Sequence, residues 1–101
     1  MQTILQQLID LKGKTAIVTG GAMGIGFGIA YRLAEAGANV FIADLNDKVG
    51  NSAVKELSDK GWRAAFMRCD VADETQVKAT TDFAVNKYGT VDILVNNAGI
   101  Y

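Results

Sequence analysis

The sequence predicts an α/β fold with a doubly wound parallel sheet, because short apolar runs alternate with helical patterns along the chain. The apolar runs lie at residues 15–19, 39–43, 63–68 and 91–95. Each gap between consecutive runs accommodates one helix, so three strand–helix units are followed by a final strand. Strands that are apolar on both faces are typical of a parallel sheet covered by helices on both sides, with right-handed crossovers.

The first predicted helix follows the strand at 15–19. Ile25, Ile29 and Leu33 recur at helical spacing, so we expect them to form its inner face. Gly37 is expected to end this helix, because glycine is common just beyond a helix C-terminus.

The second and third helices are predicted at 47–60 and from 73 to Tyr88. The second helix is expected to have an apolar face formed by Val49, Ala53 and Leu57, with Gly61 beyond its end. The third is expected to begin with a capping-box pair, Asp73 and Gln76, and to be followed by Gly89.

Four parallel strands connected in this way are expected in the order 3-2-1-4. This is the first half of a Rossmann-type fold with one strand beyond the switch point, flanked by three helices and truncated relative to the full sheet. Ligands of such sheets bind at the carboxyl ends of the strands. The polar and glycine-rich segments of this chain all follow predicted strands, so we expect one site at that edge.

The composition favours a single globular domain. Half of the 101 residues are hydrophobic and the net charge is −1, with ten scattered Lys and Arg. This pattern argues against nucleic acid or a membrane as a partner. The chain has no His and a single cysteine, Cys69, so we expect no disulfide, no metal site and a reducing, cytoplasmic compartment. Cys69 is interpreted as a small buried hydrophobic residue.

The first residues do not have the features of a signal peptide, and no apolar run reaches the roughly 20 residues of a membrane span. Ile4, Leu5, Leu8 and Ile9 recur at helical spacing. We therefore expect residues 1–11 to be an amphipathic extension and residues 12–101 to be the nucleotide-binding portion.

The most informative segment is T-G-G-A-M-G-I-G, residues 19–26, between the first strand and the first helix. Glycines in this position turn the chain, let backbone amides approach phosphate oxygens, and let the helix pack close to the strand. The helix N-terminus also favours an anion. The predicted pyrophosphate-binding residues are Gly20, Gly21, Ala22, Met23, Gly24, Ile25 and Gly26.

Two other glycine loops are excluded by spacing. A P-loop requires Lys after its second glycine, where this chain has Phe27. The G-x-G-x-x-G fingerprint requires a further glycine where this chain has Ile29 or Tyr31. The pattern T-G-x-x-x-G-I-G resembles that of the short-chain dehydrogenase/reductase family in its common short form, and Met23 excludes the extended branch. The resemblance implies an NAD(P)-dependent oxidoreductase that transfers a hydride between a nicotinamide cofactor and an alcohol or carbonyl substrate.

Asp44 ends the second predicted strand, 18 positions after Gly26. An acid near this offset accepts hydrogen bonds from the adenosine ribose and repels a 2′-phosphate. Relatives that prefer NADP usually carry a cation at the positions of Met23 or Leu45. We therefore expect NAD rather than NADP to bind, with Asp44 and Leu45 at the ribose.

Two further segments resemble family motifs. By this resemblance Asp70 accepts from the adenine amine and Val71 completes the adenine contact. The run Asn96-Asn97-Ala98-Gly99 resembles the second family motif, and this resemblance implies that its first Asn supports the sheet. The resemblance places Asn97, Ala98 and Gly99 at the cofactor.

The chain departs from the family in its catalytic residues. The family uses a Tyr-x-x-x-Lys pair for proton transfer, but Glu35 and Asp92 stand four residues after Tyr31 and Tyr88, and Tyr101 is the last residue. We therefore predict no catalytic residue in this chain and no activity of the chain alone. The fourth strand is expected to form an exposed apolar edge.

Two interpretations stay open at this point. The chain is either the cofactor-binding part of a complete enzyme, which would be a homo-oligomer by resemblance, or a non-catalytic nucleotide-binding module. A Rossmann-type methyltransferase is a third, more distant alternative, since its loop does not require the T-G-x-x-x-G-I-G pattern. A Tyr-x-x-x-Lys motif encoded after Tyr101 would identify the chain as the cofactor-binding part of a complete enzyme.

Overall fold

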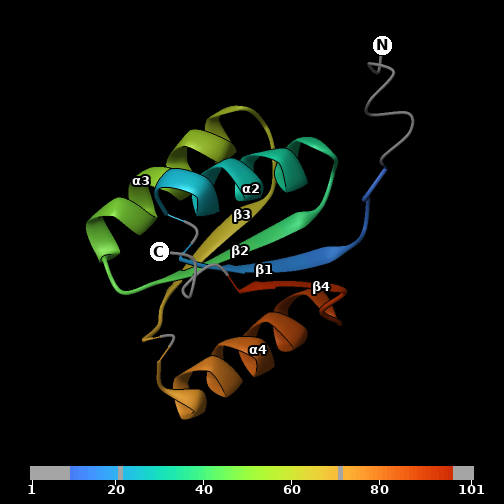
Figure 1. Ribbon diagram of the computed structural model, residues 1–101. Coiled ribbons are helices and arrows are strands. Elements are labelled where there is room, and N and C mark those ends of the chain that lie inside the picture. The colour runs from blue at the N-terminus through green and yellow to red at the C-terminus, as the bar shows by residue number, and fades with distance from the viewer. Residues whose placement is uncertain (1–9, 21, 71, 97–101) are drawn as a thin grey trace.

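The computed structural model describes residues 10–20, 22–70 and 72–96, and these form a single sheet with helices on both faces (Figure 1). All strand pairs are parallel and the order is β3-β2-β1-β4, which confirms the predicted topology. The strands are β1 (Thr15–Thr19), β2 (Asn39–Asp44), β3 (Ala64–Arg68) and β4 (Ile93–Asn96). The helices are α2 (Gly24–Glu35), α3 (Asp47–Asp59) and α4 (Glu74–Tyr88). Helices α2 and α3 cover one face of the sheet and α4 covers the other.

The central strands are apolar on both faces because each face is covered. Ala16, Val18, Val40 and Ile42 pack toward α2 and α3. Ile17 and Phe41 pack against Ala84 of α4 on the other face. The alternation of β1 and β2 side chains thus forms two core clusters, as expected for a doubly wound sheet.

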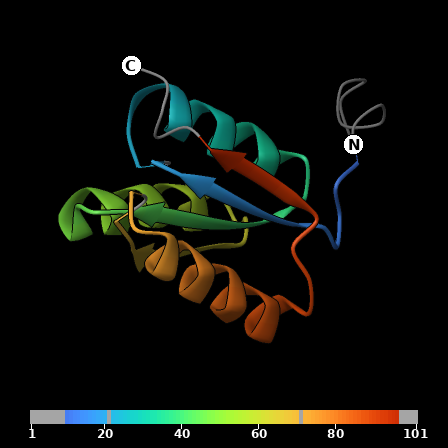
Figure 2. The ribbon, with the colours of Figure 1, turned by 60° about the horizontal axis from the view of Figure 1, so that its bottom comes forward.

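Strand β4 forms one edge of the described sheet (Figure 2). It begins two residues later than predicted. Ahead of the ladder, Asp92 accepts a hydrogen bond from Thr15 N through its Oδ2 and donates one from its backbone N to Thr15 O, both at 2.9 Å. Within the described residues β4 pairs with β1 alone, and Leu94 is 57% exposed. This agrees with the predicted exposed edge.

The predicted inner face of α2 is wrong for Ile25, whereas Leu33 packs partly buried against the core cluster, as predicted. The residues of α2 that are buried against the sheet are Gly26, Ala30 and Ala34, whereas Ile25 is 65% exposed. The reason is the close approach of α2 to the sheet, which only small side chains allow. The predicted inner face of α3 is confirmed for Ala53 and Leu57, which are buried together with Gly50.

Candidate functional site

The glycine turn lies where the sequence predicts it, at the carboxyl end of β1. Gly20 and Gly24 have φ angles of 65° and 58°, a region that favours glycine. The backbone N of Gly20 donates to Ala43 O of β2 at 2.7 Å, which ties the turn to the neighbouring strand. Gly26 is buried in the first turn of α2, where it lets the helix start close to the sheet. Gly21 lies outside the described residues.

The N-terminus of α2 differs from those of α3 and α4. Its N-cap residue is Met23, whose side chain makes no capping hydrogen bond, and its first turn has no acidic residue. In contrast, α3 and α4 are capped by Asn46 and Asp73 and carry Asp47 and Glu74 in their first turns. A helix start without a carboxylate is compatible with an external anion, because the first backbone N–H groups and the helix dipole both attract negative charge.

Asp44 lies at the carboxyl end of β2 and faces the glycine turn. Its Oδ2 accepts from Ala22 N at 3.4 Å, and its Oδ1 accepts from Asn46 N at 3.1 Å. The cap of α3 is instead Asn46, whose Oδ1 accepts from Val49 N at 3.1 Å. Asp44 therefore orients the turn rather than capping a helix, and its half-buried carboxylate stands beside the proposed phosphate-binding backbone.

Asp70 follows β3 and is held in a turn. Its Oδ1 accepts from Ala72 N at 3.0 Å, and its backbone O accepts from Asp73 N at 2.9 Å. Its own N donates to Gln76 Oε1 at 2.8 Å. The structure thus brings Asp70 to the same edge as Asp44, because Cys69 N also donates to Asp44 O at 2.9 Å. Cys69 is buried, as expected.

The predicted capping box at the start of α4 needs a correction. Asp73 caps α4 by accepting from Thr75 N at 2.9 Å. In a capping box Gln76 would accept from the N-cap backbone N–H. Here its Oε1 accepts from Asp70 N and its Nε2 donates to Asp73 Oδ2 at 3.2 Å. The turn at Asp70 already occupies the backbone N–H of Asp73, so the Gln76 side chain reaches one turn further back.

Three large apolar side chains are exposed next to the glycine turn and Asp44. Met23 is 64%, Ile25 65% and Leu45 53% exposed. Exposed apolar groups that gather around polar backbone are typical of ligand-binding surfaces. The other predicted site residues, Val71, Asn97, Ala98 and Gly99, lie outside the described residues.

The described tyrosines are not placed for proton transfer at this edge. Tyr31 packs edge-on against Trp62 with ring centroids 5.0 Å apart. Tyr88 ends α4 and packs into the core beside Ile17 and Phe41. Burial raises the pKa of Tyr88, an effect that the nearby Arg63 partly opposes, whereas an acid–base tyrosine needs a lowered pKa.

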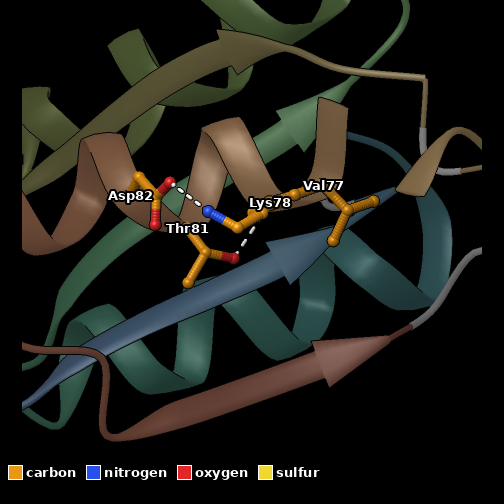
Figure 3. A network of polar contacts seen from close by, with 4 residues as sticks. All are labelled: Val77, Lys78, Thr81 and Asp82. Carbon is orange, nitrogen blue, oxygen red and sulfur yellow. Dashed lines mark hydrogen bonds and ion pairs between the residues drawn. The ribbon is translucent and has the colours of Figure 1, made fainter. Parts of the chain in front are cut away.

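One ion pair among the described residues lies on the exposed surface of α4. Lys78 Nζ lies 3.1 Å from Asp82 Oδ2, and Thr81 Oγ1 donates to Val77 O at 3.0 Å (Figure 3). Such exposed i,i+4 pairs contribute little stability. Lys78 is therefore a paired surface cation of α4.

A separate cavity of about 420 Å³ lies at the opposite, amino edge of the sheet. The segments that line it are the approach to β1, the end of α2 and the approach to β3, including Trp62. Among the described residues, none of those predicted to bind the dinucleotide lines this cavity. No helix of the described residues is long and apolar enough to cross a membrane.

Known proteins that resemble this chain share one family. A family model described as short chain dehydrogenase matches residues 14–101. The chain is 48% identical over 91 residues to the 7alpha-hydroxysteroid dehydrogenase of Escherichia coli strain K12, which covers 90% of this chain and 36% of that enzyme. It is 50% identical over 91 residues to the 3-oxoacyl-(acyl-carrier-protein) reductase FabG of Chlamydia muridarum, covering 89% of this chain and 37% of that protein.

A solved structure gives the same result for the fold. The chain superimposes on a crystal structure of an actinorhodin polyketide ketoreductase variant with NADPH with a TM-score of 0.80 and 38% identity, covering 83% of this chain and 32% of that one. The chain belongs to the short-chain dehydrogenase family. It spans about a third of the length of the relatives it matches.

Proposed function

We propose that this chain is the NAD-binding part of a short-chain dehydrogenase that acts on a small-molecule alcohol or carbonyl substrate. The observation that carries the proposal is the position of Asp44, whose carboxylate lies 3.4 Å from Ala22 N in the glycine turn. An acid at this place brings a ribose-binding group and a phosphate-binding turn together at the carboxyl edge of the sheet.

The residues at this edge fit the parts of a dinucleotide. The turn from Gly20 to Gly26 and the uncapped start of α2 would hold the pyrophosphate through backbone N–H groups. Asp44 would accept from the ribose hydroxyls, and Asp70 from the adenine amine. On the basis of the family motifs, we also propose that the cofactor contacts Val71, Asn97, Ala98 and Gly99. The bound nicotinamide would supply the hydride chemistry, and this chain's residues would bind and orient it.

The chain is proposed to bind without turnover when alone. Tyr31 and Tyr88 both pack elsewhere, so the edge has no proton donor of the family's kind among the described residues. The non-catalytic module is the second candidate function, and the same observation favours it. Homo-oligomerisation of the complete enzyme is likewise a proposal that rests on the family.

The preference for NAD is tested by titrating the full chain with NAD and NADP by calorimetry, as wild type and as Asp44→Asn. We expect wild type to bind NAD more tightly, because the 2′-phosphate of NADP meets the Asp44 carboxylate. Asp44→Asn should reduce the preference for NAD over NADP by about tenfold. This is the size expected from losing both a hydrogen bond to a charged group and the repulsion of the 2′-phosphate.

The matched control is Asp59→Asn, which makes the same charge change at the far end of α3. Asp59 forms an exposed ion pair with Lys55 at 2.8 Å, so its loss should leave the affinity ratio unchanged. Identical ratios in wild type and Asp44→Asn would show that Asp44 has only a structural role in the turn.

A further inference from the structure

Arg68 is the register partner of Asp44 at the carboxyl edge of the sheet. Strands β2 and β3 pair in parallel, and the last pair of the ladder is Asp44 with Arg68. Neighbouring strands of a sheet lie about 4.8 Å apart, and paired residues point to the same face. In the sheet, a cationic residue is therefore the direct neighbour of the acid that is proposed to select the ribose.

The alternation of β3 identifies the face that Arg68 shares with Asp44. Ala64 and Phe66 pack against the cluster under α2 and α3, whereas Ala65 and Met67 pack against the cluster under α4. Arg68, two residues after Phe66, continues the first set. Val40 and Ile42 place Asp44 on the same face by the same count.

The described contacts leave the Arg68 guanidinium accessible. Both oxygens of Asp44 accept from backbone N–H groups of Ala22 and Asn46. The ion pairs among the described residues do not include Arg68, which is exposed. Backbone N–H groups thus hold the Asp44 carboxylate. Arg68 takes no part in these hydrogen bonds, so its guanidinium can donate to a ligand.

We propose that Arg68 is a specificity-determining residue that binds the 2′-phosphate of NADP and so limits the NAD preference set by Asp44. The inference rests on the proposed function and deepens it. A guanidinium binds a phosphate with two parallel N–H donors, which gives charge-assisted hydrogen bonds of fixed geometry. Asp44 repels the 2′-phosphate and Arg68 attracts it, so the chain binds both cofactors with a modest preference for NAD.

The test uses ADP-ribose and 2′-phospho-ADP-ribose, which carry the adenosine half of each cofactor and differ only in the 2′-phosphate. Affinities of the full chain for both probes are measured by calorimetry. Arg68→Gln should weaken binding of the phosphorylated probe by about tenfold and of ADP-ribose by less than about twofold. Arg68→Lys should retain part of the phosphate affinity, because it keeps the charge and loses the fork.

A second arm removes the repulsion. In Asp44→Asn the phosphorylated probe should bind more tightly than ADP-ribose, and this advantage should disappear in the double variant Asp44→Asn/Arg68→Gln. Arg63→Gln is the matched control, because Arg63 precedes the opposite end of β3. Lys48→Gln tests the exposed cation in the first turn of α3 and should change the probe ratio less than Arg68→Gln does.

The outcomes separate the inference from the proposed function. If wild type binds both probes and Arg68→Gln weakens both affinities equally, Arg68 does not bind the 2′-phosphate. The same conclusion holds if Lys48→Gln changes the probe ratio more than Arg68→Gln does. Either result leaves the proposed function standing. Binding of neither probe by wild type overturns the proposed function, and the inference with it.

Discussion

Replacing Phe41 by Ala is expected to lower the free energy of unfolding by about 3–5 kcal/mol, the usual cost of emptying a buried aromatic site. Phe41 is fully buried on β2 and packs with Ile17 and Ala84 between the sheet and α4. Small domains have roughly 5–15 kcal/mol of stability in total. The variant should therefore lose a large share of it in urea unfolding followed by circular dichroism.

The matched control is Phe83→Ala. Phe83 is 49% exposed on α4, with its ring centroid 5.6 Å from that of Phe41. Its truncation removes less buried surface, so the loss should be less than half as large. Phe41→Leu, which keeps most of the volume, covers the case in which Phe41→Ala does not fold and should cost about 1.5 kcal/mol or less. Equal losses for Phe41→Ala and Phe83→Ala would contradict the assigned core.

Two helical glycines should respond to alanine with opposite signs. A Cβ at Gly50 of α3 would overlap the ring of Phe66 on β3. We expect Gly50→Ala to destabilise the chain by about 1–3 kcal/mol, because the ring must move out of a packed position. A Cβ at Gly28 of α2 would meet nothing within 4 Å. Gly28→Ala should therefore stabilise the chain by about 0.5–1 kcal/mol through helix propensity.

A double-mutant cycle identifies the cause of the Gly50 effect. In a Phe66→Leu background the clash is relieved, so Gly50→Ala should cost clearly less than in wild type. Additive effects of the two substitutions would show that the contact between α3 and β3 is not the source of the loss. This contact is relevant to the site, because it sets the distance of α3 from the sheet next to Asp44.

The strand order and the position of the glycine turn could be predicted from the sequence because they depend on patterns along the chain. Apolar runs mark the buried strands, and the polar residues at their carboxyl ends mark the edge of the sheet where the turn lies. The inner face of α2 could not be predicted in this way. Ile25, Ile29 and Leu33 have the same spacing as Gly26, Ala30 and Ala34, and hydrophobicity favours the larger set. Close packing of the helix on the sheet selects the small residues for the buried positions, and Leu33 packs only partly buried against the same core.

The polar contacts of the site depend on three-dimensional pairing, which sequence patterns do not contain. The bond between Asp44 and Ala22 N exists because the turn after β1 folds back toward β2. The position of Arg68 beside Asp44 follows from the register of β2 and β3, and nothing in the local sequence marks it. Gln76 likewise accepts from Asp70 N instead of from the N-cap backbone N–H, because of the turn at Asp70.

Binding of a dinucleotide at the carboxyl edge of the sheet can be tested by a nuclear magnetic resonance titration of the full chain with NAD. We expect the backbone amide signals of Ala22, Gly24 and Asn46 to shift with a common saturation curve. The signals of Gly61 and Trp62, at the amino-edge cavity, should stay in place. Saturable shifts at Gly61 and Trp62 with none at Ala22 and Gly24 would show that NAD binds at the amino-edge cavity and not at the carboxyl edge.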